Sequence, residues 1–333
     1  DEVIIPALMS RGVTLADARE YGIIGCVEPQ KPFKTDGWHD AAFFNMCRPL
    51  ELVFSNGVDK GAQISIKTGN VEDMTTFEEF YNAYKAQETY MIGLMVNAIN
   101  AIDTAHSERV PLPFLSCMVE DCVKEGKTVQ EGGAHYNFTG PQGFGIANMA
   151  DGLWTVKTLV FDEKKVTMAE LKDALIHNYG QGLSPKAAKN ATQEVVINLA
   201  KAGKSVTESQ VADICRMFLT GEQDPAKRKR YEEILDMINE LPKYGNDIEE
   251  IDLLARDVAN IYAKELEKHK NPRGGMFQAG LYPVSANVPL GEQTGATPDG
   301  RLANTPIADG VGPRQGADTK GPTAAANSVA KLE

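Results

Sequence analysis

Residues 25–30 read Gly-Cys-Val-Glu-Pro-Gln, and residues 34–45 read Lys-Thr-Asp-Gly-Trp-His-Asp-Ala-Ala-Phe-Phe-Asn. The residues that lead into the first stretch, 21–25, are mostly apolar and end on glycine, which predicts a brief strand that enters a turn. A short span of chain therefore brings together a thiol, several carboxylates and a histidine.

Cys26 and Glu28 form a thiol–carboxylate pair two residues apart. Pro29 and Pro32 exclude a regular helix here, so we expect both side chains to lie on a loop. A thiolate that attacks an electrophile needs a nearby base, usually histidine, and the nearest histidine, His39, is 13 positions further along the chain. A thiol can instead pass a single electron and hydrogen while the carboxylate handles protons beside it. Residue chemistry alone leaves both reactions and a purely structural role open.

Four stretches in the first part of the chain are expected to be helical. One is short, over 11–20, and a second covers 40–56 and ends at an Asn-Gly pair. The strongest periodic pattern runs from 77 to 104, with Thr76 as its N-cap. Prolines at 111 and 113 would start the fourth helix, over 111–125.

The second part of the chain changes character near residue 270. Residues 167–270 are rich in Ala, Lys, Glu and Leu and are expected to be helical, with breaks near 180–185, 221–225 and 242–245. The glycine- and proline-rich stretch that follows contains two short strand-like pieces, 281–284 and 286–288. The last residues, 327–333, look like the start of an interrupted helix, so both ends of the chain suggest a piece of a longer protein.

The composition is that of an ordinary globular protein. Apolar residues make up 42% of the 333 residues and charged residues 24%. The formal net charge of -12 argues against a general affinity for nucleic acid or anionic membranes. The sequence has no apolar run of about 18 residues and no basic, then apolar, N-terminal signal. We therefore expect a cytoplasmic protein that binds neither nucleic acid nor membrane.

The five cysteines and five histidines indicate neither a disulfide framework nor a metal site. The cysteines are odd in number and scattered, and no pair has zinc-finger spacing with a matching second pair. The histidines show no His-x-x-x-His pairing. Apart from Cys26, we expect the cysteines to be reduced, buried thiols.

The two stretches quoted first resemble the Cys loop of glycyl radical enzymes (the pyruvate formate-lyase-like superfamily), most closely the glycerol and diol dehydratases and related eliminases. The resemblance continues in the same order through Glu131-Gly-Gly-Ala, Tyr136-Asn-Phe-Thr-Gly-Pro-Gln-Gly143, Tyr244-Gly-Asn-Asp247, Asn271-Pro-Arg-Gly-Gly275, Gly295-Ala-Thr-Pro-Asp-Gly-Arg301, Ala308-Asp-Gly-Val311 and Lys320-Gly-Pro-Thr323. So many motifs in one order identify the chain as a member of this family.

The resemblance implies roles for four residues of the Cys loop. Cys26 matches the thiyl-radical cysteine, which abstracts a hydrogen atom from a substrate carbon. Glu28 matches the carboxylate that removes the proton of the hydroxyl on that carbon, after which the group on the next carbon leaves. Asp40 falls where the glycerol dehydratase has an aspartate that holds substrate hydroxyls, and His39 stands beside it. A helix-starting pair with a capping carboxylate is the alternative for His39 and Asp40.

Comparison with other branches of the family narrows the reaction. Residue 27 is Val, whereas pyruvate formate-lyase has two adjacent cysteines, so acyl transfer to sulfur is not expected. Arg273 and Phe277 lie where sulfite-eliminating members can line the substrate pocket. For Arg273, a structural contact with a loop carboxylate or carbonyl is an equal alternative.

The resemblance implies elimination of water from a small diol by a thiyl-radical mechanism. One alternative is a C–S lyase that releases sulfite from a hydroxyalkanesulfonate such as isethionate. Another, from a different class, is a non-catalytic fragment that only folds or binds partners.

The implied fold is α/β, half of the ten-stranded glycyl radical enzyme barrel with outer helices. The Cys loop would cover 21–45 and a helical insertion about 180–240. The sequence contains no Arg-Val-x-Gly-Tyr segment of the kind that carries the radical glycine, so the C-terminal glycine radical domain is expected to be absent and this chain alone inactive. No bound cofactor is expected; an S-adenosylmethionine-dependent iron–sulfur activating enzyme would install the radical. The other implied partners are a small-molecule substrate and, at full length, a second copy.

Overall fold

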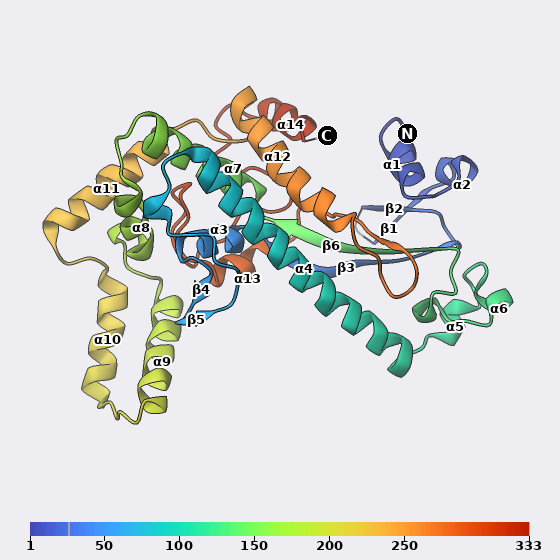
Figure 1. Cartoon of the computed structure of the whole chain (residues 1–333), viewed down its shortest axis with the longest axis horizontal. Helices are drawn as coiled ribbons and strands as arrows, with labels where there is room; N and C mark the ends of the chain where they lie inside the picture. Colours follow the sequence, from blue (N-terminus) through green and yellow to red (C-terminus); the bar gives the residue numbers. More distant parts are fainter. Residues whose placement is uncertain (26, 333) are drawn as a thin grey trace. The chain divides into compact units, whose positions relative to one another are not determined.

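The computed structural model describes residues 1–25 and 27–332 and has mixed helices and strands (Figure 1). The chain divides into two compact units. The first unit comprises Asp1–Phe44, Glu88–Gly143 and Ala259–Tyr282; the second comprises Asn45–Gln87, Phe144–Val258 and Pro283–Glu333. Cys26 lies outside the described residues, and every other predicted site residue belongs to the first unit.

A three-stranded sheet forms the centre of the first unit. It has the order β3 (Thr35–Asn45), β6 (Tyr136–Phe144) and β7 (Met276–Phe277). Strands β6 and β7 are parallel, with Phe138 opposite Met276 and Thr139 opposite Phe277. Every residue of β6 is buried, as expected for a central strand.

The Cys loop begins as a hairpin. Strand β1 (Gly22–Ile24) pairs antiparallel with β2 (Glu28–Gln30), which confirms the predicted strand over 21–25. Glu28 was expected on a loop, and that expectation is wrong, because it is the first residue of β2. Pro29 is compatible with this position since each strand of a two-stranded ribbon has a free edge that needs no backbone donor.

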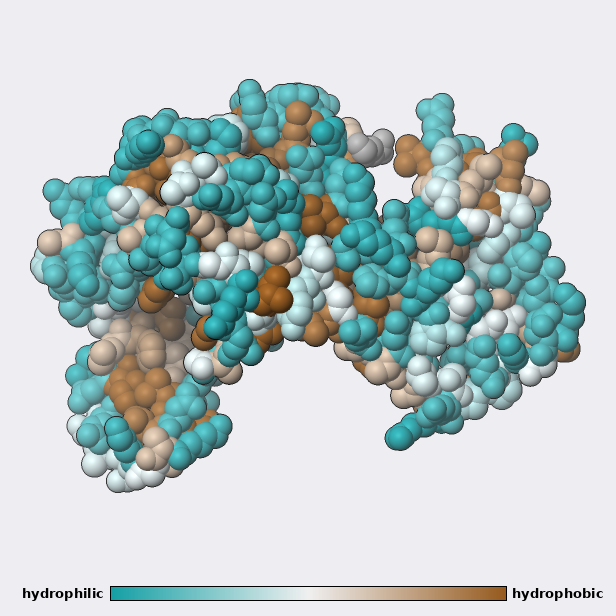
Figure 2. All heavy atoms as spheres, viewed as in Figure 1, coloured by the Kyte–Doolittle hydropathy of each residue, from teal (hydrophilic) through white to brown (hydrophobic). Residues whose placement is uncertain are grey.

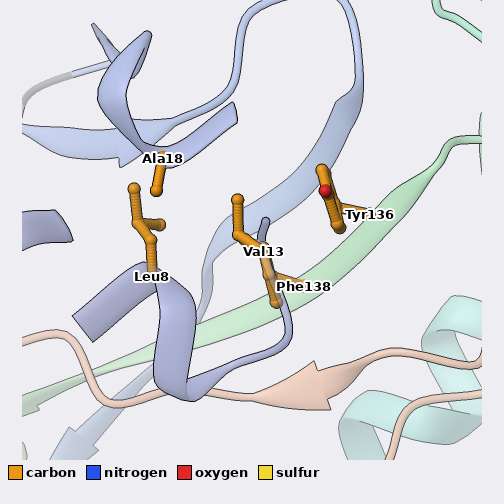
Figure 3. Packing of buried hydrophobic residues seen from close by; sticks show 5 residues of the cluster. All are labelled: Leu8, Val13, Ala18, Tyr136 and Phe138. Carbon is orange, nitrogen blue, oxygen red and sulfur yellow. The ribbon is translucent and has the colours of Figure 1, made fainter. Parts of the chain in front are cut away.

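Two short helices pack against the start of β6. Helix α1 (Ile4–Ser10) was not expected, and α2 (Leu15–Arg19) is shorter than the predicted helix over 11–20. The Thr14 hydroxyl caps α2 by accepting a hydrogen bond from the backbone of Asp17 at 3.2 Å. Figure 3 shows the apolar cluster that joins these helices to β6: Leu8, Val13, Ala18, Tyr136 and Phe138.

The predicted helix over 40–56 is wrong in its first part. Strand β3 continues to Asn45, and α3 covers only Cys47–Phe54. The Asn45 side chain accepts a hydrogen bond from the backbone of Cys47 at 3.0 Å, and Pro49 lies in the first turn, so the local sequence starts the helix there.

Helix α4 (Phe77–Arg109) confirms the strongest sequence pattern and extends it by five residues. The Thr76 hydroxyl accepts a hydrogen bond from the backbone of Glu79 at 3.3 Å, as expected of an N-cap. The single helix expected over 111–125 is wrong. It is divided into α5 (Pro113–Ser116) and α6 (Cys122–Glu125), because Asp121 adopts a left-handed φ of 75°.

The expected helical stretch 167–270 is confirmed with its three expected breaks, and a further break at 202–207 was not expected. It contains α8 (Met168–Ile176), α9 (Pro185–Lys201), α10 (Glu208–Thr220), α11 (Pro225–Glu240) and α12 (Glu249–Leu266). Helices α9 and α10 lie side by side (Figure 1), and Figure 2 shows hydrophobic residues gathered along this pair. Exposed apolar side chains there are Ile197, Met217 and Leu219.

The remaining elements are short. They are β4 (Val58–Asp59), β5 (Ala62–Gln63), α7 (Ile146–Thr155), α13 (Asn287–Glu292), α14 (Pro322–Ala330), a π-helix (Val156–Asp162) and 3-10 turns at Val71–Asp73, Val129–Glu131 and Asn178–Gly180. The strand-like pieces expected at 281–284 and 286–288 are wrong, because 281–284 is irregular and α13 begins at Asn287. Residues 327–330 do belong to a helix, α14. Among the described residues, no helix is long and apolar enough to cross a membrane.

Candidate active site

Strand β2 presents two buried polar side chains. Glu28 is 3% exposed and Gln30 is 2% exposed, and since they are two residues apart they share one face of the strand. The Glu28 carboxylate accepts a hydrogen bond from the backbone of Val27 at 2.9 Å. Residue 25 must be small, because a Cβ there would come within 2.6 Å of the same carboxylate. The hairpin therefore fixes the position of the Glu28 carboxylate.

Strand β3 contributes His39 and Asp40. Neighbouring residues of a regular strand point to opposite faces, but Asp40 has a left-handed φ of 57° that interrupts the alternation. Both side chains consequently interact electrostatically with the Glu28 carboxylate. The structure thus brings three of the predicted site residues together.

Burial determines the protonation of this group. It lowers the pKa of His39 to about 4, and the nearby Glu28 carboxylate opposes the shift only in part. The imidazole is therefore neutral at pH 7. Burial, and then repulsion by Glu28, raise the pKa of Asp40, while the adjacent Gln142 side chain opposes the rise.

Strand β6 supplies the floor under His39. A Cβ on Gly140 would overlap the Nδ1 atom of His39, so the imidazole lies against bare backbone. On the other side of the ring, Nε2 of Gln278 is 3.3 Å from Nε2 of His39. Neither Gly140 nor Gln278 was predicted as a site residue, although Gly140 belongs to the family motif over 136–143.

Arg273 lies on the opposite face of β6. Its guanidinium contacts both Asp103 oxygens at 3.0 and 3.2 Å and the Asp36 carboxylate at 2.6 Å. It also donates to the Phe138 carbonyl and to the Thr139 hydroxyl. With the further bond to the Asp36 carbonyl, all its donor groups have acceptors.

Phe277 shares this second face, because it pairs with Thr139 and paired residues of a sheet point the same way. Its side chain is fully buried, and its ring meets His269 edge-on at 6.5 Å. The structure therefore places Glu28 close enough to His39 and Asp40 to affect the pKa of both. Arg273 and Phe277 lie on the Thr139 side of the sheet, from which Arg273 also acts on the pKa of His39. Within the described residues, no group of three or more His, Cys, Asp and Glu side chains could hold a metal ion.

The comparisons with known proteins agree with this fold. The model of the pyruvate formate lyase-like family matches residues 1–291, and the chain belongs to that family. This confirms the resemblance to glycyl radical enzymes and the α/β fold, which matches part of their barrel.

Two solved structures are similar over the whole chain. One, from a study of 1,2-propanediol dehydration in Roseburia inulinivorans, is 64% identical, with a TM-score of 0.92, and the match covers 40% of it. The other, the glycerol-bound B12-independent glycerol dehydratase from Clostridium butyricum, is 51% identical, with a TM-score of 0.83 and 36% covered. The (2S)-3-sulfopropanediol dehydratase of Klebsiella oxytoca is 34% identical over the whole chain and 35% of its own length. The chain thus spans about a third of the length of the curated relatives.

Proposed function

We propose that this chain is the part of a glycyl radical dehydratase that carries the hydrogen-abstracting cysteine, and that the full enzyme removes water from a small 1,2-diol such as 1,2-propanediol or glycerol. The observation that carries the proposal is that the Glu28 carboxylate, two residues after Cys26 in the sequence, acts electrostatically on both His39 and Asp40 of strand β3. The identity to enzymes of 1,2-propanediol and glycerol supports the choice of substrate class.

In the proposed mechanism, Cys26 moves a hydrogen atom and Glu28 moves a proton. Cys26, as a thiyl, takes a hydrogen atom from the carbon that bears a hydroxyl, and Glu28 takes that hydroxyl's proton. The hydroxyl on the adjacent carbon then leaves as water with the proton returned from Glu28, so Glu28 ends the cycle as a carboxylate. The product carbon finally takes the hydrogen atom back from the Cys26 thiol. The family's glycyl radical supplies the unpaired electron for this cycle.

The other two residues hold the substrate. Burial and the Glu28 carboxylate raise the pKa of Asp40, and we assign its carboxyl to a hydrogen bond with the departing hydroxyl. His39 is neutral and its Nε2 contacts Gln278, so it shapes this side of the site without adding a charge. For Arg273 we propose the structural alternative, in which it fixes β3 through Asp36.

The contacts of Arg273 remove one candidate partner for a substrate sulfonate. A sulfonate is an anion and requires cationic donors. Arg273 has acceptors for all its donors, so it is not free to bind a sulfonate.

The partners of the full enzyme follow from its family. We propose that an S-adenosylmethionine-dependent iron–sulfur activating enzyme installs the radical on a glycine outside this chain, and that the enzyme works as a cytoplasmic homodimer. The helical pair within about 180–240 would lie on its outer surface.

An anaerobic substrate panel tests the reaction. The activated full-length enzyme should convert 1,2-propanediol or glycerol to the aldehyde and leave isethionate, dihydroxypropanesulfonate and hydroxyproline unchanged. Sulfite release, with no aldehyde from either diol, would contradict the proposal.

A further inference from the structure

Gln142 is a buried polar residue whose side chain is unsatisfied. It lies on β6 and is 0% exposed, and neither its Oε1 nor its Nε2 has a hydrogen-bond partner among the described residues. A buried amide without partners is costly, so such a group calls for an explanation.

The position of Gln142 places its amide on the site face of the sheet. It is two residues after Gly140, so it shares the face of β6 against which His39 lies. Its amide is close enough to the Asp40 carboxyl to lower the pKa of that carboxyl, although the two groups do not form a hydrogen bond of good geometry. The unsatisfied group thus lies next to the residue proposed to hold a substrate hydroxyl.

The backbone beside Gln142 is arranged to make room for the amide. Gly280 bridges to Gln142, its N–H donates to the Pro141 carbonyl at 3.0 Å, and its carbonyl accepts from Gly143 at 2.8 Å. A Cβ on Gly280 would overlap the amide oxygen of Gln142. The φ of Gly280 is not left-handed, so its backbone conformation does not require glycine. The closeness of the amide does.

We propose that Gln142 is a substrate-binding residue whose amide holds a hydroxyl group of the substrate beside Asp40. An amide both donates and accepts hydrogen bonds, as a hydroxyl does, and neither group carries a charge. The inference rests on the proposed function, because it assumes a hydroxylated substrate on this face of the sheet.

Gln87 provides a matched control. It is also a fully buried glutamine, but its amide is paired: its oxygen accepts from the Ser65 hydroxyl at 2.5 Å, and its nitrogen donates to the Ile66 carbonyl at 2.8 Å and to the Thr68 hydroxyl. Gln87→Leu should therefore lower the melting temperature without changing substrate affinity.

The test is a calorimetric titration of the full-length enzyme with 1,2-propanediol and with glycerol, before radical activation so that no turnover occurs. Gln142→Leu should raise the Kd by about tenfold or more, because the substrate hydroxyl loses a buried hydrogen-bond partner. Gly280→Ala should also raise the Kd. The effects of the two changes should be less than additive, because both act through one amide. After activation, KM should rise while the radical signal per chain stays unchanged.

Each outcome decides the inference. An unchanged Kd in Gln142→Leu, with a lowered melting temperature, would show that the amide pairs with another segment of the enzyme and would overturn the inference while leaving the diol dehydratase intact. If Gln142→Leu fails to fold, Gly280→Ala gives the same comparison with Gln142 retained. If the unsubstituted enzyme binds neither diol, the proposed function is wrong and the inference falls with it.

Discussion

The imidazole of His39 lies in the space that a side chain at Gly140 would occupy. The two residues belong to neighbouring strands of one sheet and are far apart in sequence. Gly140 is therefore required by the histidine rather than by its own backbone, since its φ is not left-handed. This relationship, and the similar one between Gly280 and Gln142, show that bare backbone on β6 and after β7 makes space for the polar side chains of the site.

Gly140→Ala should displace His39 and lower turnover of the full-length enzyme by about tenfold or more, because overpacking of this kind costs about 1–3 kcal/mol. Anaerobic product assays with radical quantitation would measure the effect. The matched control is Gly93→Ala in the interior of α4, where a Cβ would meet no atom within 4 Å. It should leave turnover unchanged and stabilise the helix by about 0.5–1 kcal/mol. Equal activity of both variants would refute the role of Gly140.

Arg273→Met should lower the free energy of unfolding by about 3–5 kcal/mol, because it leaves a buried carboxylate unpaired. The Asp103 side chain is only 4% exposed and would lose its partner. Denaturant unfolding, with Arg273→Met/Asp103→Asn as the compensating double variant, would measure this. The control is Arg216→Met, which removes an exposed ion pair with Asp213 and should lower the free energy of unfolding by less than about 1 kcal/mol. A loss at Arg273 no larger than at Arg216 would contradict the contact network.

His39 should make stability depend on pH. Its pKa is about 4 when folded, below the ordinary 6.5, so the unfolded chain binds a proton first as the pH falls. The contribution of neutral His39 to the free energy of unfolding is complete above pH 6.5. It declines by roughly 3 kcal/mol as the pH falls towards 4. His39→Gln should abolish this part of the difference between pH 7 and pH 4.5, measured by denaturant unfolding.

Asp151 provides a control of opposite sign. Burial raises its pKa to about 7, so the folded state holds the extra proton and stability declines as the pH rises from 3.8 towards 7. Asp151→Asn should therefore make the free energy of unfolding rise more steeply with pH, because the opposing effect of Asp151 is removed and that of His39 remains. If both variants shift the profile the same way, one of the two protonation assignments is wrong.

The chain of residues 1–333 alone should be inactive and should bind a dye that is specific for exposed apolar surface. Ile23, Ile24 and Val27 on the Cys-loop hairpin and Phe43 on β3 are all more than 40% exposed. Anaerobic incubation with the activating enzyme and S-adenosylmethionine should give no radical signal. A monodisperse chain with a sharp melt and no dye binding would contradict this expectation.

The helices were the part of the fold that could be predicted from the sequence. The pattern over 77–104 and the breaks between α8 and α12 are local signals, carried by periodicity, caps, glycine and proline. The strands were not predicted where pairing with distant chain overrides local preference. Asp40 to Asn45 has helical spacing but pairs with β6, and β6 itself contains two glycines and a proline.

The site divides in the same way. Glu28, His39 and Asp40 could be proposed from the sequence because they belong to one contiguous motif. Gly140, Gln142 and Gln278 could not be found that way, because their role depends on the order of β3, β6 and β7, which no local signal specifies. The contacts of Arg273 with Asp36 and Asp103 could not be predicted either, because they join segments that are far apart in sequence.

The most direct test of the dehydratase proposal is Cys26→Ala in the activated full-length enzyme, followed by electron paramagnetic resonance and aldehyde assay on the same sample. The glycyl radical should form as in the unsubstituted enzyme, because activation acts on the glycine, while no aldehyde forms from 1,2-propanediol. Glu28→Gln should behave in the same way, since an amide cannot accept the hydroxyl proton. Aldehyde production by the Cys26→Ala enzyme would contradict the account.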